Sequence, residues 1–175
     1  MDFDGKLSVQ TYESPYGPLL LGEVDARLCL CYWTKAKYAS QVVDGLLRQL
    51  HLEISGAPKE VVTEAEVQLE EYFMGKRRTF DLPCFLSGTD FQQSVWRTLS
   101  QIPYGATISY RSLAEQMGRP MAVRAVASAV GRNPLQLILP CHRVVGAHSE
   151  LTGYAGGIKV KSALLALEAH VSGNI

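Results

Sequence analysis

Residues 28–33, Leu-Cys-Leu-Cys-Tyr-Trp, are apolar at every position, and this run restricts the fold more than any other feature of the 175-residue chain. An uninterrupted apolar strand is buried on both faces, whereas an alternating strand has one face in water. Turn-forming residues separate this run from two further strand patterns at 6–13 and 19–24. The first third of the chain therefore predicts an antiparallel sheet that other elements cover.

Two helices are expected to follow in this half of the chain. Apolar residues recur at helical spacing from 39 to 50, and a second helical pattern ends at Gly75. Thr63 and Glu66 fit a capping box, so we expect the second helix to begin there. Residues 78–82 are expected to return as a strand.

The pattern becomes helical beyond residues 83–88, which predicts a domain boundary in that stretch. The expected helices cover residues 90–102, 110–117, 120–130 and 160–170. The second and third of these, joined by a turn that contains Gly118, resemble a helix-turn-helix. We therefore expect an α+β fold, with an α+β supporting domain over 1–86 and a mostly helical, winged-helix-like domain over 87–175.

The charges of the chain are balanced in number but not in position. Residues 1–87 hold 9 basic and 13 acidic side chains, whereas residues 88–175 hold 8 basic and 4 acidic ones. A positive half favours an anionic partner such as nucleic acid. The chain lacks an apolar run of about 18 residues, and residues 1–6 do not resemble a signal peptide. We expect a cytoplasmic monomer, nucleoid-associated if bacterial, with reduced cysteines and no membrane partner.

Cys141 differs from the other cysteines because it lies between Pro140 and the pair His142-Arg143. A nearby histidine and cation can lower the pKa of a thiol, and the thiolate is the nucleophilic form. Neighbouring side chains usually point in different directions, so a bridging water is one route for proton transfer to His142. The alternative is a core cysteine beside a surface histidine.

No cofactor or metal is expected from the sequence. Cys29 and Cys31 lie within the apolar run and are interpreted as core residues, because a zinc site needs two further ligands at suitable spacing. The glycine-rich stretch 153–157 lacks the Gly-Lys-Ser/Thr ending of a phosphate-binding loop, and no dinucleotide fingerprint is present.

Residues 140–145, Pro-Cys-His-Arg-Val-Val, resemble the active-site motif of the O6-alkylguanine-DNA alkyltransferases. Further segments resemble motifs of the same family and occur in its order; these are 91–96, 109–114, 122–126, 133–134 and 152–157. The likeness extends from residue 89 to residue 170. It implies direct-reversal DNA repair by a methylated-DNA–protein-cysteine methyltransferase that acts once.

The resemblance implies a role for each of five catalytic residues. Cys141 accepts the alkyl group from O6 of guanine, His142 takes the thiol proton through a water, and Glu168 orients His142. Tyr110 donates a hydrogen bond or proton to the departing base, and Asn133 organises the turn before the cysteine strand. The sequence leaves open the size of the alkyl group and whether O4-alkylthymine is a second substrate.

The resemblance also implies that double-stranded DNA carrying alkylated bases binds through its minor groove. A base inside the duplex must be flipped out, and Arg124, like Tyr110, assists this step. Small side chains let the helix enter the narrow groove; they are Ala122, Ala125, Ala127 and Ser128. The base pocket is expected to be walled by Val144, Tyr154 and Ala155.

Other interpretations of the same residues remain. Taken alone, Glu168 is an ordinary solvated helix carboxylate and Tyr110 a partly buried aromatic. A damage sensor without chemistry is disfavoured because such relatives lack the cysteine that stands here at 141. A cysteine hydrolase requires an oxyanion hole. A helix-turn-helix regulator reads bases with several polar side chains, which residues 121–130 do not offer.

Overall fold

The computed structural model describes residues 5–55, 57 and 59–173. The chain divides into two compact units, Met1–Ser87 and Gly88–Ile175. Residues 1–4, part of the segment that was compared with a signal peptide, lie outside the described residues. Within the described part of the chain, every helix is too short or too polar to cross a bilayer.

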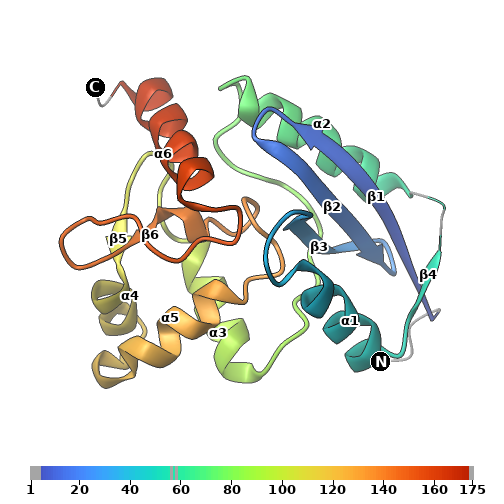
Figure 1. Ribbon diagram of the computed structural model, residues 1–175, viewed down its shortest axis with the longest axis horizontal. Helices are drawn as coiled ribbons and strands as arrows, with labels where there is room; N and C mark the ends of the chain where they lie inside the picture. The colour runs from blue at the N-terminus through green and yellow to red at the C-terminus, as the bar shows by residue number, and fades with distance from the viewer. Residues whose placement is uncertain (1–4, 56, 58, 174–175) are drawn as a thin grey trace. The chain divides into compact units, whose positions relative to one another are not determined.

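The first unit is built on a four-stranded sheet with the order β3-β2-β1-β4 (Figure 1). Its strands are β1 (Lys6–Ser14), β2 (Gly17–Val24), β3 (Arg27–Trp33) and β4 (Glu53–Ser55). The first three form the predicted antiparallel meander, and β3 is buried from Leu28 onward. The sheet is mixed because β4, which the sequence pattern did not indicate, pairs in parallel with β1.

The turn of the hairpin between β2 and β3 has a well-defined backbone conformation. Asp25 and Ala26 both have left-handed backbone angles, with φ of 47° and 56°. Two consecutive left-handed residues form the type I′ turn, whose twist matches that of the flanking strands. The turn thus fixes the register that buries β3.

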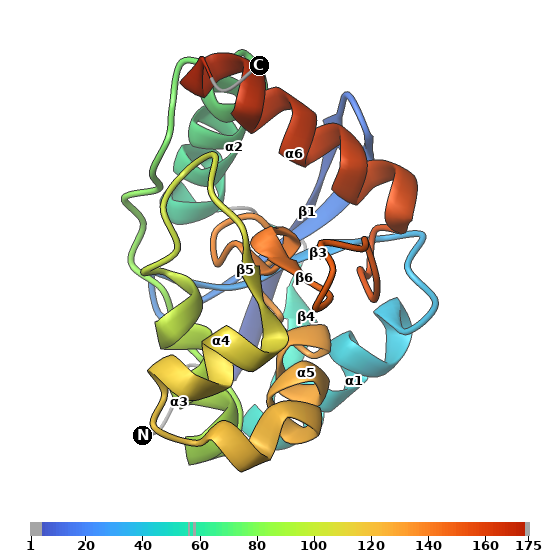
Figure 2. The ribbon, with the colours of Figure 1, turned by 90° about the vertical axis from the view of Figure 1, so that its left-hand side faces the viewer.

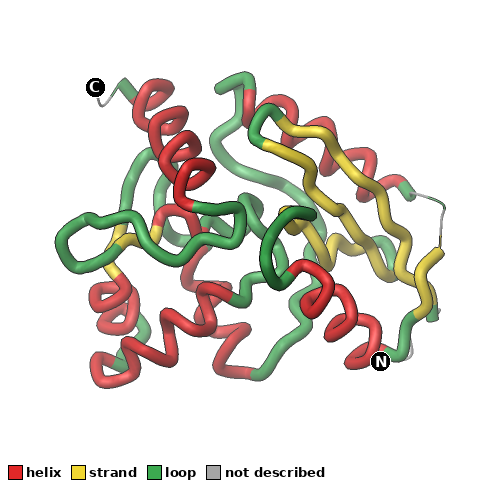
Figure 3. The backbone as a smooth tube through the Cα atoms, in the orientation of Figure 1, coloured by secondary structure: helices red, strands yellow, loops and turns green. Residues whose placement is uncertain are grey.

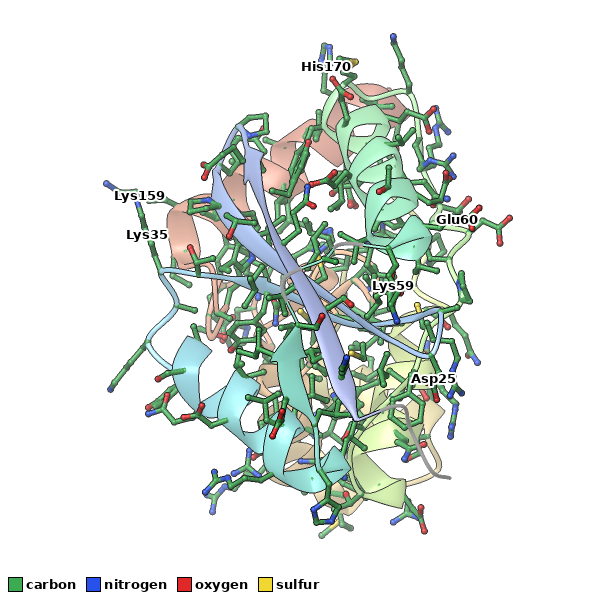
Figure 4. All side chains as sticks on the ribbon, turned by 90° about the vertical axis from the view of Figure 1, so that its right-hand side faces the viewer. Asp25, Lys35, Lys59, Glu60, Lys159 and His170 are labelled. Atoms are coloured by element: carbon green, nitrogen blue, oxygen red, sulfur yellow. The ribbon has the colours of Figure 1, made fainter. Side chains whose placement is uncertain are left out.

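Two helices complete the first unit, α1 (Ala39–Leu50) and α2 (Glu60–Phe73), and α2 packs on β1, β2 and β3 (Figure 1). The expectation that α2 begins at Thr63 is wrong. The carboxylate of Glu23 on β2 accepts a hydrogen bond from the Val62 N–H at 3.2 Å, so a distant strand stabilises the helix start. Figure 4 shows Lys59 and Glu60 where α2 begins.

The expected strand over 78–82 does not form. The Gln68 side chain bonds both the N–H and the C=O of Asp81, each at 2.9 Å, and takes the place of a neighbouring strand. Pairing begins later, where Leu28 donates to Pro83 and accepts from Phe85. The chain therefore joins the edge of β3 only through an isolated bridge at Cys84.

The second unit is mostly helical, as predicted. Its elements are α3 (Asp90–Leu99), β5 (Ile108–Ser109), α4 (Tyr110–Gln116), η1 (Pro120–Ala122), α5 (Val123–Gly131), η2 (Cys141–Arg143), β6 (Val144–Val145) and α6 (Ile158–Ser172). Figure 2 shows α3, α4 and α5 packed together, with β5 beside β6. Figure 3 shows that loops form most of the chain between α5 and α6.

Side-chain hydrogen bonds fix the helices of this unit. Thr89 and Gln92 form a reciprocal capping box at the start of α3. The indole of Trp96 donates to the carbonyl of Ala129 at 2.8 Å and joins α3 to α5. Gly118, with φ of +67°, turns the chain between α4 and η1. The helix-turn-helix arrangement expected here is present, although its second helix opens with a 3-10 turn.

Replacing Thr89 with Ala is expected to lower the free energy of unfolding by about 1 kcal/mol, because the Gln92 N–H loses its acceptor. Thr79→Ala, which changes an exposed side chain, is the control and is expected to have little effect. Urea denaturation measures the free energy of unfolding of both variants. Equal losses for the two variants would contradict the importance of the capping box.

Candidate active site

The segment before Cys141 is held by the side chain of Asn133, which is fully buried. Its amide donates to the carbonyls of Leu135 and Leu139 at 3.3 and 2.9 Å, and its oxygen accepts from the Leu135 N–H at 3.0 Å. Leu137 adopts a left-handed backbone with φ of 71°, which is unusual for a leucine. The expected cysteine strand is wrong: the chain turns tightly here, and Cys141 opens the 3-10 turn η2.

The thiol of Cys141 is buried, with only 4% of the residue exposed. It donates a hydrogen bond to Oε1 of Gln136 at 3.3 Å. Burial raises the pKa of Cys141 to about 11, although a hydrogen bond from Asn133 and the positive charge of Lys161 act in the opposite direction. The resting sulfur is therefore a neutral thiol, and nucleophilic attack requires a base.

His142 and Glu168 provide such a base and its partner. Nε2 of His142 lies 2.7 Å from Oε1 of Glu168, and both side chains are fully buried. Burial lowers the pKa of His142, while Glu168 opposes that change. A neutral imidazole that donates from Nε2 to an ionised carboxylate leaves Nδ1 as the basic nitrogen. The alternative of a solvated Glu168 is excluded.

Groups other than His142 also hold the carboxylate of Glu168. Arg143 donates to both carboxylate oxygens, from Nε at 2.9 Å and from Nη2 at 3.0 Å, and the N–H of Gly105 donates at 3.1 Å. Nη1 of Arg143 also donates to the carbonyl of Ile102 at 2.7 Å. Burial raises the pKa of Glu168, but the hydrogen bonds from His142 and Arg143 outweigh it and lower the pKa to about 2.

Lys161 is a second buried cation that the sequence analysis missed. Its Nζ donates to the carbonyl oxygens of Val144 and Thr152 at 2.5 and 2.8 Å. Burial lowers the pKa of Lys161, and the Cys141 sulfur raises it. Lys161, Leu164 and Glu168 are the fully buried residues of α6. Their helical spacing was the signal that one face of this helix is interior.

The aromatic residues of the expected site lie around the same loop. The Tyr110 hydroxyl donates to the carbonyl of Thr152 at 3.4 Å. Burial raises the pKa of Tyr110, the Thr152 hydrogen bond opposes this, and Cys141 adds to it. Tyr154 meets the His142 ring edge-on, with centroids 6.4 Å apart. Val144 is fully buried, whereas Ala155 is half-buried.

Helix α5 has one buried and one exposed face. Val126, Ala129 and Val130 are buried, whereas Arg124 is exposed. The predicted small residues follow this division, with Ala125 and Ser128 exposed and Ala122 and Ala127 half-buried. A hollow on this surface is lined by Arg111 and residues 120–125.

Comparison with known proteins identifies the family. Residues 7–85 match the ribonuclease-like domain of 6-O-methylguanine DNA methyltransferase, and residues 90–170 match its DNA-binding domain. The chain belongs to the 6-O-methylguanine DNA methyltransferase family. The resemblance seen in the sequence is confirmed.

Relatives in this methyltransferase family match along almost the whole chain. A methylated-DNA–protein-cysteine methyltransferase of Methanosarcina acetivorans is 43% identical over 157 residues, 90% of this chain and 95% of that protein. A constitutive one of Bacillus subtilis is 42% identical and covers 90% and 93%. The crystal structure of Mycobacterium tuberculosis OGT in complex with DNA aligns with a TM-score of 0.79 and 40% identity, over 95% of this chain and 94% of that one.

Acid is expected to destabilise the protein through the buried carboxylate. Glu168 stays ionised in the folded state to about pH 2, whereas its reference pKa is 4.5. The unfolded state therefore binds more protons as the pH falls through this window, and the free energy of unfolding drops by about 3 kcal/mol. His142, whose pKa lies below 6.5 in the folded state, adds a loss that begins as the pH falls through 6.5.

Chemical denaturation between pH 7 and pH 2 measures this dependence. Glu168→Gln is expected to be less stable at neutral pH and to have a flatter profile below pH 4.5. Glu115→Gln, which changes an exposed carboxylate on α4, is the control and should retain the wild-type slope. Parallel profiles for wild type and Glu168→Gln would show that this carboxylate does not carry the acid sensitivity.

Proposed function

We propose that this protein repairs DNA by direct reversal, with Sγ of Cys141 as the acceptor of the alkyl group on O6 of a guanine. A bond forms between sulfur and the alkyl carbon while the carbon–O6 bond breaks, and the restored guanine leaves. The observation that carries the proposal is the buried hydrogen bond between Glu168 and His142, the residue that directly follows this cysteine. A thioether is chemically stable, so each molecule acts once.

The proposed proton path uses the charge states of the buried groups. The hydrogen bonds from Arg143 keep Glu168 ionised. Glu168 in turn holds Nε2 of His142, so Nδ1 takes the thiol proton through a water molecule. Lys161 and Asn133 favour the thiolate that results. Hydrogen bonds and charge therefore offset part of the cost of burying an anionic sulfur.

Tyr110 is proposed to protonate the departing base. Burial raises the pKa of its hydroxyl, so the phenol stays protonated and can donate to the guanine as negative charge develops there. The pocket for the base is proposed to be walled by Val144, Tyr154 and Ala155, of which Val144 is buried and the other two are half-buried. The same pocket is a candidate site for O4-alkylthymine.

Helix α5 is proposed as the DNA-binding surface, with the minor groove as its target. Asp and Glu are absent from the sequence between 116 and 149, whereas Arg119, Arg124 and Arg132 are exposed there. Exposed arginines beside small, uncharged side chains suit a narrow groove lined by phosphates. Arg124 is proposed to fill the space left by the flipped nucleotide.

The second unit is thus proposed to carry both DNA binding and alkyl transfer, and the first to support it. We propose that the protein acts as a monomer in the cytoplasm, within the nucleoid if bacterial. Its four free cysteines suit a reducing compartment.

Intact-protein mass spectrometry after mixing with duplex DNA that contains O6-methylguanine tests the reaction. The wild type is expected to gain about 14 Da in one-to-one stoichiometry, because one methyl group replaces the thiol hydrogen. Cys141→Ser should gain nothing, and Cys84→Ser, the control at an exposed cysteine, should gain the same mass as wild type. DNA binding without a mass gain would instead identify a damage sensor.

Arg124→Ala tests the proposed base flipping. Transfer from duplex DNA is expected to slow by roughly tenfold or more, because the flipped state loses the side chain that stabilises it. Transfer from a free O6-alkylguanine base, which needs no flipping, should be unchanged. Arg97→Ala removes one exposed charge from α3 and is the matched control. An equal loss with the free base, or with Arg97→Ala, would contradict this role of Arg124.

A further inference from the structure

Gln136 has a fixed orientation beside the proposed nucleophile. It is 1% exposed, and its Nε2 donates to the backbone carbonyl of Asn133 at 2.9 Å. A carbonyl oxygen only accepts hydrogen bonds, so the amide nitrogen must face Asn133 and the amide oxygen must face the sulfur. Oε1 accordingly accepts the hydrogen bond of the Cys141 thiol at 3.3 Å.

This orientation favours one protonation state of the sulfur. An amide oxygen accepts a hydrogen bond from a neutral thiol, but it presents the negative end of its dipole to a thiolate. Asn133 and Lys161 have the opposite effect, since an N–H donor and a cation both stabilise a thiolate. The backbone N–H groups of Cys141 and His142 also favour the anion. Among the side chains around the sulfur, Gln136 therefore opposes Asn133 and Lys161.

We propose that Gln136 is a positioning residue that holds Cys141 as an unreactive thiol in the DNA-free protein. The inference rests on the proposed role of Cys141 as the alkyl acceptor. Such a residue has a purpose in a protein whose thiol is consumed by one reaction, because a permanent thiolate would also react with other small electrophiles. When His142 takes the proton, the hydrogen bond to Gln136 is lost.

If Gln136 favours the neutral thiol, two replacements of Gln136 are expected to affect the pKa of Cys141 differently. Gln136→Met keeps a similar volume and removes the acceptor, so the pKa of Cys141 is expected to fall by about one unit, roughly tenfold more thiolate at a given pH. Gln136→Glu keeps an oxygen toward the sulfur, and the pKa should not fall. An ionised carboxylate at this position would raise the pKa of Cys141 further because of like charge.

The ultraviolet absorbance of the thiolate, titrated with pH, measures the pKa. Each variant is made with Cys84→Ser, to remove the exposed thiol, and compared with its own Cys141→Ser counterpart. The rate of Cys141 alkylation by iodoacetamide, in which a carbon–sulfur bond replaces the carbon–iodine bond and the thiol proton passes to solvent, gives a second readout. This rate should rise severalfold in Gln136→Met, less than the gain in thiolate because a thiolate of lower pKa is a weaker nucleophile, and it should not rise in Gln136→Glu.

A purely structural role for Gln136 predicts a different result. Both replacements disturb the bond to Asn133, so damage to the loop would move both variants in the same direction. A fall in pKa for both, or no fall for Gln136→Met, would overturn the inference; Gln136→Leu replaces the Met variant if that variant does not fold. Neither readout uses DNA, so failure of the inference is distinct from failure of the proposed repair reaction.

Discussion

The ionised carboxylate of Glu168 is the group on which the site depends. A charge this deeply buried persists only if donors surround it, and here Arg143, His142 and Gly105 supply four hydrogen bonds. These donors come from two separate parts of the chain, so one carboxylate fastens α6 to η2 and to the loop after α3. The same carboxylate sets which nitrogen of His142 is basic.

The sulfur of Cys141 depends on a finer balance. Burial and Gln136 favour the thiol, whereas Asn133 and Lys161 favour the thiolate. A proton acceptor such as His142 can therefore determine when the nucleophile forms.

Much of the fold followed from local pattern. The apolar run at 28–33 predicted a strand buried on both faces, and the helical patterns that begin at residues 90 and 110 placed the starts of α3 and α4 correctly. Two of the errors have a common cause. The start of α2 is set by Glu23, and the backbone of Asp81 is satisfied by Gln68, both through contacts between residues far apart in sequence.

The sequence by itself determined the family, the two-part α+β organisation and Cys141 as the candidate nucleophile, because motifs and hydrophobic periodicity depend only on the order of residues. Only the tertiary structure decided the states of the side chains around that cysteine. Glu168, which by sequence alone is a solvated carboxylate, is a buried anion in the structure. The structure also places Gln136, Arg143 and Lys161 at the site. Burial and hydrogen-bond partners set protonation, and folding alone brings those partners together.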